Sequence, residues 1–315
     1  MKVGVIGTGN WGKNLVKTFS NLGILTGIAD GLEANRTAAL EVNPAIEVFN
    51  EHTSLLKKSY DAVAIATPAQ THFLIAKEAI EAGCDVFVEK PMTLDPKESK
   101  ALVALARQHD KILMVGHLLL YQPAISFIKE VLERNELGQI YNMHQRRSKL
   151  GRARSVENVL WSFGVHDVAV LLYLSDQKPS EIQAVGHCGL HPTVEDDTFL
   201  HLTFPDGSKA HLHNSWLWPT VERSLIITGE KGMLVYDELE QNVKIIRKTI
   251  DSNLQNIDRG EEVAYQGNGQ PLGIELEHFI HCCNTRNRPY SCGQSGLEVV
   301  KVLDQAENIL KRYRK

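Results

Sequence analysis

A short apolar run at the start of the chain breaks directly into a turn with three glycines, Gly7, Gly9 and Gly12. Glycine at these positions allows a tight turn off a strand, leaves no side chain over the backbone, and permits close packing of the next helix. A helix that starts there presents free backbone N–H groups and the positive end of its dipole. The turn therefore predicts a strand–turn–helix unit whose backbone holds a diphosphate.

The residues around this turn support the prediction. Residues 2–6 are apolar like a buried strand, and Leu15 and Phe19 recur at helical spacing. A second apolar run ends in Asp30, where a carboxylate would accept hydrogen bonds from ribose hydroxyls. We therefore expect a dinucleotide site, formed by Gly7, Thr8, Gly9, Asn10, Trp11, Gly12 and Asp30.

Asp30 also bears on the choice of nicotinamide cofactor. Its carboxylate repels a 2'-phosphate, and the following Gly31 and Leu32 supply no cation to receive one. The sequence therefore favours NAD over NADP. Arg36 keeps an alternative open, because it follows a few residues later and could turn toward a 2'-phosphate, although a solvated helix position is the simpler interpretation.

The pattern along the chain predicts two domains of the α/β and α+β classes. At 315 residues the chain has room for both. Residues 1–118 alternate apolar strands with helices, which is typical of a doubly wound parallel sheet in a Rossmann domain. Residues 119–315 contain successive strand-like runs with short turns, which predicts a mostly antiparallel sheet. The polar, Gly/Asn/Gln-rich stretch 251–271 is expected to be a mobile loop.

Composition narrows the class of protein. Lys and Arg number 34 against 38 Asp and Glu, and the net charge of −4 argues against a nucleic-acid binder. No apolar stretch has the length of a membrane span and no signal peptide precedes the first strand, so we expect a cytoplasmic protein. The five cysteines form no CxxC pair, which favours reduced thiols. His211 and His213 lack a third ligand nearby, so no metal site is expected.

The carboxyl ends of the parallel strands hold the next candidates, because ligands of such sheets lie beyond those ends. Besides the turn and Asp30, the candidates for cofactor binding are Thr67, Pro68, His72, Glu89 and Lys90. Lys90 directly follows an apolar strand and precedes Pro91, so we expect its amine to point toward the nicotinamide in a catalytic role. A cis bond between them would aim the side chain more firmly. A structural ion pair is the alternative for this lysine.

The motifs in this first domain jointly resemble the Gfo/Idh/MocA family of sugar and inositol dehydrogenases. Together with the glycine turn they are ATPAQTH at 66–72, EKP at 89–91 and GH at 116–117. The resemblance implies a Rossmann domain joined to a domain with a large open, mostly antiparallel sheet. It also implies a homodimer or homotetramer, for which Leu212, Trp216 and Trp218 would be exposed strand residues able to pair sheets.

In that family a helix of the second domain carries an aspartate and a histidine four residues apart, and the histidine reaches the substrate hydroxyl. Here His166 is kept, whereas Ser162 replaces the aspartate. Serine can hydrogen bond but cannot stabilise an imidazolium as a carboxylate would. Three alternatives stay open: His166 works with less help, Asp167 compensates, or Lys90 takes most of the acid–base role.

Longer stretches resemble the branch of this family that oxidises the 3-hydroxyl of UDP-N-acetylglucosamine. They are residues 116–125, 150–167, 215–237 and 271–282. A basic cluster, Arg146, Arg147, Lys149, Arg152 and Arg154, suits a diphosphate, unless it is a solvated loop or a subunit contact. Our candidates for holding the sugar nucleotide are Tyr121, Arg147, Arg152, Asn158, Asp167 and Trp216. For Trp216 a place in the core or in an interface is the alternative.

The sequence therefore predicts an NAD-dependent dehydrogenase with Lys90 and His166 as catalytic residues. A sugar hydroxyl would lie between them, and one of the two would remove its proton as hydride leaves. Two alternatives stay open. The same residues could oxidise a free sugar or inositol, and the change at Ser162 makes a non-catalytic NAD-dependent sensor conceivable.

Overall fold

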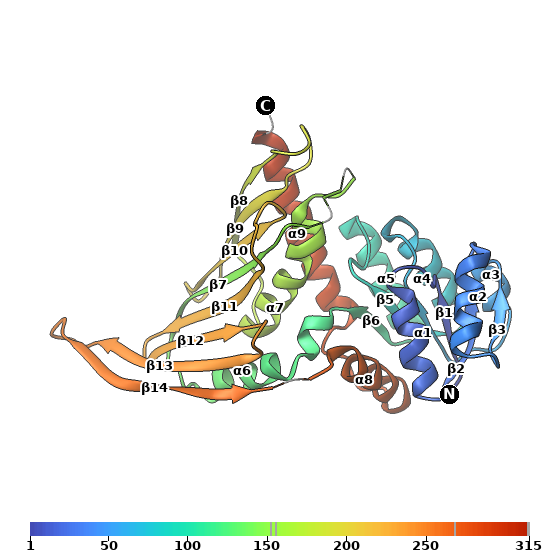
Figure 1. Cartoon of the computed structure of the whole chain (residues 1–315), viewed down its shortest axis with the longest axis horizontal. Helices are drawn as coiled ribbons and strands as arrows, with labels where there is room; N and C mark the ends of the chain where they lie inside the picture. Colours follow the sequence, from blue (N-terminus) through green and yellow to red (C-terminus); the bar gives the residue numbers. More distant parts are fainter. Residues whose placement is uncertain (152, 155, 268, 314–315) are drawn as a thin grey trace. The chain divides into compact units, whose positions relative to one another are not determined.

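The computed structural model divides the chain into two compact units, each described here by itself (Figure 1). The described residues are 1–151, 153–154, 156–267 and 269–313. The first unit comprises Met1–Leu118 and Pro271–Val300, and the second comprises Leu119–Gln270 and the residues from Lys301 onward. The sequence expectation placed all of 119–315 in one domain. The structure instead groups 271–300 with the first unit, because the ring of Phe279 packs against that of Phe87 with centroids 5.7 Å apart.

The first unit is built on a six-stranded parallel sheet in the order β3-β2-β1-β4-β5-β6. Its strands are β1 (Val3–Ile6), β2 (Leu25–Ala29), β3 (Glu47–Phe49), β4 (Ala62–Ile65), β5 (Asp85–Glu89) and β6 (Leu113–Gly116). The strands β1, β4, β5 and β6 are buried along their whole length, as parallel strands are when helices cover both faces. The doubly wound parallel sheet expected from the sequence is confirmed.

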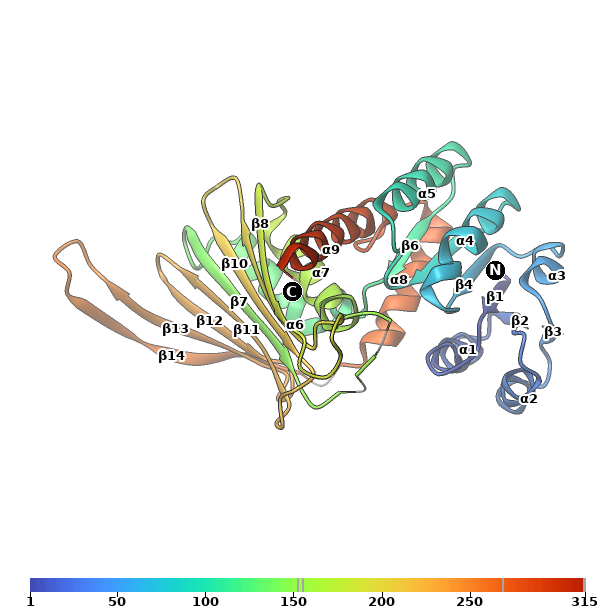
Figure 2. The ribbon, with the colours of Figure 1, turned by 90° about the horizontal axis from the view of Figure 1, so that it is seen from above.

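Helices cover both faces of this sheet, with α4 and α5 on one side and α1 and α2 on the other (Figure 2). Their bounds are α1 (Gly12–Asn21), α2 (Glu33–Val42), α3 (His52–Leu56), the 3₁₀ turn η1 (Ala69–Thr71), α4 (His72–Glu81), α5 (Pro96–Gln108) and α8 (Pro271–Thr285). Local chemistry sets these bounds. The Asp95 carboxylate accepts the Lys97 N–H at 2.7 Å and Pro96 takes the first helical position, which together start α5.

The second unit is built on an eight-stranded sheet in the order β14-β13-β12-β11-β7-β10-β9-β8. Its strands are β7 (Ile140–Ser148), β8 (Glu181–His187), β9 (Asp197–Thr203), β10 (Lys209–Ser215), β11 (Glu222–Gly229), β12 (Gly232–Asp237), β13 (Asn242–Ile250) and β14 (Asn256–Gln266). The β7–β10 pair is parallel and the other neighbouring pairs are antiparallel. The large, mostly antiparallel sheet expected from the sequence is confirmed.

Helical segments of the second unit pack near one face of this sheet. They are the 3₁₀ turn η2 (Leu118–Tyr121), α6 (Pro123–Glu133), the π-type turn η3 (Leu160–Gly164), α7 (Val165–Ser175) and the later part of α9 (Gly293–Tyr313). The expectation that Leu212 and Trp216 are exposed is wrong, since their exposed fractions are 1% and 2%. Trp216 packs edge-on against Phe163 of η3, whereas Trp218 is partly exposed.

The segment expected to be a mobile loop contains a strand, so that prediction is wrong. β14 pairs antiparallel with β13 at the edge of the sheet. Its side chains are mostly exposed on both faces, so the apolar alternation that marks a half-buried strand is missing from the sequence. Main-chain pairing and two cross-strand ion pairs, Arg247–Glu262 at 2.6 Å and Lys248–Asp258 at 3.0 Å, accompany the extended form.

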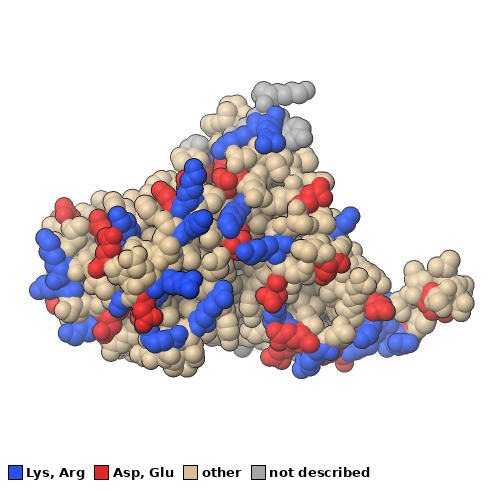
Figure 3. Space-filling view, turned by 180° about the vertical axis from the view of Figure 1, so that it is seen from behind, with Lys and Arg blue, Asp and Glu red and all other residues tan. Residues whose placement is uncertain are grey.

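The surface carries charges of both signs. Basic and acidic side chains are interspersed on the face drawn in Figure 3. Within the described part of the chain, no helix combines the length and the apolar composition needed to cross a membrane.

Candidate active site

The glycine turn after β1 fits a dinucleotide diphosphate. Gly7 has a φ of +85°, and a Cβ there would lie 2.7 Å from the Thr67 backbone nitrogen. A Cβ on Gly12 would overlap the carbonyl oxygen of Gly7, so α1 can approach the sheet only through a glycine. At Gly9 the nearest atom to a Cβ would be the Asn35 amide at 3.8 Å, which leaves the backbone open to a phosphate. No side chain caps the start of α1. The N–H groups of Lys13 and Asn14 donate to the carbonyl oxygens of Gly9 and Trp11, so the positive end of the helix dipole faces the turn.

Asp30, at the end of β2, is held in place by hydrogen bonds from its neighbours. One carboxylate oxygen accepts the Thr8 N–H at 2.7 Å and the Asn35 amide at 3.1 Å. The other accepts the Leu32 N–H at 2.8 Å. Burial acts to raise the pKa of Asp30, but hydrogen bonds from the N–H groups of Leu32 and Thr8 hold this pKa below its ordinary value. The Arg36 guanidinium donates to the Asp30 carbonyl oxygen at 2.8 Å, so this cation lies at the same edge of the sheet.

The exits of β4 and β5 are joined by the imidazole of His72. Its Nε2 lies 2.8 Å from the carbonyl oxygen of Thr67, and its Nδ1 lies 2.9 Å from that of Pro91. The ring is 1% exposed, and burial lowers its pKa. The structure therefore places His72 beneath the strand ends, where it holds them together, while Thr67 and Pro68 reach the surface above it.

Glu89 and Lys90 end β5 beside the glycine turn. The Glu89 carboxylate accepts the indole N–H of Trp11 and the main-chain N–H of Lys90, the latter at 3.3 Å. Burial raises the pKa of Glu89 to about 7, while Lys90 acts in the opposite direction. The Lys90–Pro91 peptide bond is cis. His117, which follows β6, is buried, and this burial together with the charge of Lys90 lowers its pKa to about 3.

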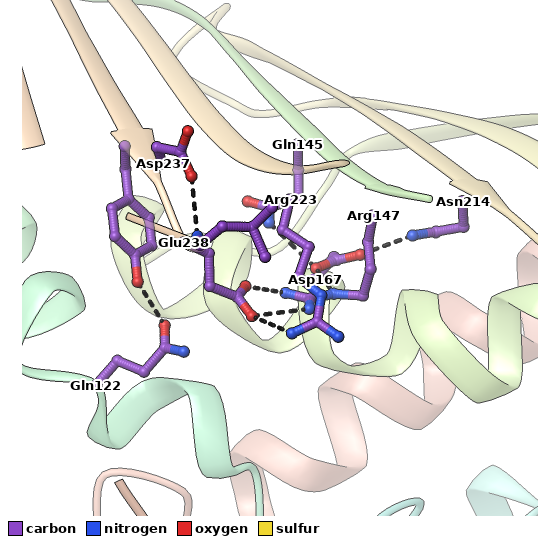
Figure 4. Close-up of polar contacts among 10 residues, drawn as sticks. Gln122, Gln145, Arg147, Asp167, Asn214, Arg223, Asp237 and Glu238 are labelled. Carbon is purple, nitrogen blue, oxygen red and sulfur yellow. Dashed lines mark hydrogen bonds and ion pairs between the residues drawn. The ribbon is translucent and has the colours of Figure 1, made fainter. Parts of the chain in front are cut away.

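The second unit contains a buried polar network centred on Asp167 of α7 (Figure 4). This carboxylate is fully buried and accepts the Arg147 Nε at 2.8 Å. The amides of Gln145 and Asn214 donate to it at 3.1 and 2.6 Å. The three donors come from β7 and β10, where Asn214 pairs with Arg147. The network therefore fixes the first turn of α7, which carries His166, against the sheet.

Arg147 joins this network to a second buried carboxylate. Its two terminal nitrogens donate to Glu238 at 3.1 and 2.6 Å, and Glu238 also accepts from Arg223 at 3.1 Å. Burial by itself lowers the pKa of Arg147, but the carboxylates of Asp167 and Glu238 raise this pKa above its ordinary value. The structure thus pairs two of the sequence-derived substrate candidates, Arg147 and Asp167, with each other.

The basic cluster begins on the strand β7, which explains the placement of Arg147. Alternate residues of β7 point to opposite faces of the sheet. Arg146 points outward, where it binds Glu222 at 2.7 Å and lies over the Trp218 ring at 5.3 Å, whereas Arg147 points inward. Arg152 lies outside the described residues.

The segment that leads into His166 is anchored by Asn158. Its Oδ1 accepts the Trp161 N–H at 3.2 Å and its amide donates to the buried Glu195 at 2.9 Å. The Trp161 indole in turn donates to Glu307 of α9 at 3.0 Å. Asn158, a substrate candidate, therefore positions η3. π-type turns often occur at functional sites. His166 follows this turn and is partly exposed, whereas Ser162 and Tyr121 are buried.

A pocket of about 250 Å³ opens next to η3 in the second unit. Its lining residues are Ala153, Arg154, Leu190, His191, Val194, Asp196 and Trp216. The Asp196 carboxylate accepts the N–H groups of Gly189 and Leu190 at 2.7 and 2.6 Å, which folds the β8–β9 connection over the pocket. Sequence reasoning identified Trp216 but missed Asp196 and His191, because neither belongs to a motif or follows a strand of the parallel sheet.

Comparison with known proteins places this geometry in a family. The description "Oxidoreductase family, NAD-binding Rossmann fold" matches residues 1–117, and the "GFO/IDH/MocA C-terminal domain" matches residues 125–235. The chain is 26% identical over 302 residues to the UDP-N-acetylglucosamine 3-dehydrogenase of Acidithiobacillus ferrooxidans, covering 95% of this chain and 94% of that protein. A crystal structure of that enzyme superposes with a TM-score of 0.88 at 25% identity, covering 100% and 99% of the two chains.

A second relative acts on a different class of substrate. The scyllo-inositol 2-dehydrogenase (NAD(+)) of Bacillus subtilis strain 168 is 24% identical over 307 residues, which cover 92% of this chain and 88% of that protein. Both family descriptions match this chain, and its turn and Asp30 have the geometry that an NAD-binding Rossmann fold requires. The chain belongs to the Gfo/Idh/MocA family of NAD-dependent oxidoreductases.

Proposed function

We propose that the protein oxidises the 3-hydroxyl of a UDP-N-acetylglucosamine-like nucleotide sugar to a ketone, with NAD as the hydride acceptor. The likeness to a UDP-N-acetylglucosamine 3-dehydrogenase over 95% of the chain carries this proposal, because it spans both the glycine turn and the segment with His166. The relative that oxidises an inositol makes a free polyol the second candidate.

The residues of the first unit would bind and orient the cofactor. The turn would hold the diphosphate against the start of α1, and the pinned Asp30 carboxylate would accept the ribose hydroxyls. Bound NAD supplies a ring that accepts hydride. Lys90 is the residue we propose for removing the hydroxyl proton, because it lies partly exposed at the end of β5, the strand that Glu89 ties to the glycine turn.

Asp167 does not replace the missing family aspartate in this proposal. Its carboxylate already accepts from Arg147, Gln145 and Asn214, so it serves to hold α7 in place. We therefore assign to His166 the role of binding the sugar hydroxyl, and to Lys90 the greater share of the acid–base chemistry.

The diphosphate of the substrate requires cations other than Arg147, whose nitrogens bind carboxylates. Lys149 and Arg154 lie on the segment after β7, and Arg154 lines the pocket beside η3. Arg154 pairs with Glu157, but this pair is partly exposed, whereas the carboxylates that bind Arg147 are buried. We propose that these two side chains bind the diphosphate and that the pocket receives the nucleotide end of the substrate.

An assay of NADH formation with UDP-N-acetylglucosamine, other UDP-sugars and scyllo-inositol tests the proposal. Lys90→Ala is expected to lower turnover ~100-fold or more, as loss of a general base does. Arg154→Ala and Lys149→Ala are expected to raise the KM for the UDP-sugar by about tenfold each, since each removes a charge-assisted contact. Arg134→Ala, an exposed arginine on the same unit, is the matched control.

Two outcomes would contradict the proposal. If scyllo-inositol were oxidised and no UDP-sugar were, the polyol would be the substrate. If Lys90→Ala kept turnover within about threefold of wild type while NAD still bound, the assigned chemistry would be wrong.

A further inference from the structure

Two buried glutamates of the first unit, Glu89 and Glu275, lie on facing elements. Phe87 and Glu89 are two residues apart on β5 and so point to the same face of the sheet. Phe279 and Glu275 are four residues apart on α8 and so share one side of that helix. Since the rings of Phe87 and Phe279 meet with centroids 5.7 Å apart, α8 covers this face of β5 and carries Glu275 toward Glu89.

Glu275 is enclosed without a partner. It is 1% exposed, and neither of its carboxylate oxygens has a hydrogen-bond partner within the described residues. Burial, and after it the charge of Glu89, raises the pKa of Glu275 well above its ordinary value. Both effects favour the protonated form of Glu275.

Glu89 is the more exposed of the two carboxyls and the one that contacts the cofactor site. Its exposed fraction is 8%, and it holds Trp11 of the glycine turn. A Cβ on the neighbouring Gly116 would lie 3.0 Å from the Glu89 carboxylate, so the glycine leaves this carboxylate room at the strand end. Burial raises the pKa of Glu89 to about 7, which places its titration at neutral pH.

Three other titratable side chains, those of Lys90, His117 and His72, lie around Glu89. Lys90 follows it on β5 and favours its ionised form. His117 after β6 and His72 of α4 both feel the charge of Lys90, and burial, as the larger cause, lowers the pKa of each. The His117 imidazole therefore stays neutral between pH 6 and 8, and the charge of Lys90 is the one that a control variant must remove.

We propose that Glu89 and Glu275 form a carboxyl pair in which Glu89 releases a proton when oxidised nicotinamide cofactor binds and takes one up when the cofactor is reduced. The oxidised ring carries a positive charge that favours a carboxylate beside it, and the reduced ring carries none. Glu89 gives up the mobile proton, and Glu275 keeps its own. The pairing does not depend on which sugar is oxidised.

The proton balance of the reaction includes this pair. The alcohol loses a hydride to the nicotinamide ring and a proton from its hydroxyl group. Lys90 passes the hydroxyl proton on. Once the charge of the ring has disappeared, the pair holds this proton in about half of the molecules at pH 7, and in the rest it goes directly to solvent. When reduced cofactor leaves and oxidised cofactor binds, the pair returns that proton to solvent, so one proton is released for each turnover.

Calorimetric titration of the whole protein with NAD⁺, in buffers of different ionisation heat between pH 6 and 8, counts the protons released. We expect about half a proton per NAD⁺ at pH 7, since a group with a pKa near 7 is half protonated there. NADH is expected to release none. Glu89→Gln is expected to abolish the release while it still accepts the Trp11 N–H and binds NAD⁺.

Three further variants separate the pair from its surroundings. Glu275→Gln is expected to keep the release, because the mobile proton belongs to Glu89. Glu277→Gln, an exposed glutamate on the same helix, is the matched control and is expected to match wild type. Lys90→Met is expected to keep the release as well. The proposal fails if Glu89→Gln releases protons like wild type, or if Lys90→Met or Glu275→Gln abolishes the release.

Infrared difference spectra of the unaltered protein give a second readout that needs no variant to fold. Binding of NAD⁺ at pH 7 should remove a protonated-carboxyl C=O band and NADH should not. If NAD⁺ left that band unchanged, the pair would not be the source of the proton.

Discussion

The indole N–H of Trp11 donates to the carboxylate of Glu89, and this hydrogen bond ties the glycine turn after β1 to the end of β5. β4 separates these two strands in the sheet. The position of the turn that receives the diphosphate is therefore coupled to that of the strand that carries Lys90. Trp11 is 39% exposed, so the indole makes this contact without being buried.

Trp11→Phe removes the N–H donor and keeps an aromatic ring. Because Glu89 then loses its side-chain donor, we expect NAD⁺ affinity to fall by roughly 5- to 10-fold, which corresponds to the net contribution of one ordinary hydrogen bond. Calorimetric titration with NAD⁺ measures the change, and Trp218→Phe in the second unit is the control. An unchanged dissociation constant would show that the contact does not position the turn.

Gly12→Ala places a methyl group against the carbonyl oxygen of Gly7, so α1 must move away from the sheet. We expect the dissociation constant for NAD⁺ to rise at least ~30-fold, because the helix start no longer faces the phosphates. Gly31→Ala is the control, since a Cβ there meets nothing within 4 Å. Equal NAD⁺ affinity in the two variants would be inconsistent with the proposed packing role.

Glu275→Gln changes how stability depends on pH. The folded-state pKa of Glu275 is raised, so above about pH 4.5 the folded chain binds more protons than the unfolded one, and wild-type stability falls as pH rises. The glutamine side chain does not titrate, so the variant avoids this loss of stability, which amounts to about 1.4 kcal/mol per pH unit. We expect the melting temperature of the variant relative to wild type to rise with pH above about 4.5, by roughly 3 °C per unit.

A constant difference in melting temperature across that range would contradict the assignment of a retained proton to Glu275. Glu277→Gln, with its exposed side chain, supplies the baseline for this comparison.

Asp167→Asn replaces a fully buried carboxylate that binds Arg147 by a neutral amide. We expect the free energy of unfolding to fall by about 3 kcal/mol, as is typical when one partner of a buried pair loses its charge. Urea unfolding followed by circular dichroism measures it. Glu222→Gln breaks the exposed pair with Arg146 and should cost less than about 1 kcal/mol. Similar losses in both variants would rule out the anchoring role.

The part of the site that sequence could predict is the part set by local backbone chemistry. Gly7, Gly12 and Asp30 act through spacing along one strand–turn–helix unit, and spacing is visible in a sequence. Lys90 follows from the end of a single buried strand. The position of each of these side chains relative to its own strand is therefore determined by residues that are neighbours in the sequence.

The residues that sequence could not place depend on long-range pairing. Arg147 looked like one of five neighbouring cations, and only the register of β7 with β10 turns it inward to Asp167. Nothing in the sequence marks Gln145 and Asn214 as partners of Asp167, because their contact with it depends on the pairing of β7 with β10. β14 lacked apolar alternation because an edge strand with both faces exposed does not need it.

The first unit consists of two separate stretches of the chain, since α8 returns to cover β5 after the whole second sheet has been made. During synthesis the cofactor-binding unit therefore cannot complete its core until residue 300 or so has left the ribosome. A fragment that ends at Leu118 would leave Phe87 without the ring that covers it and Glu89 without its facing acid. Truncation at the apparent domain boundary would thus yield an incomplete fold, and binding studies need the full chain.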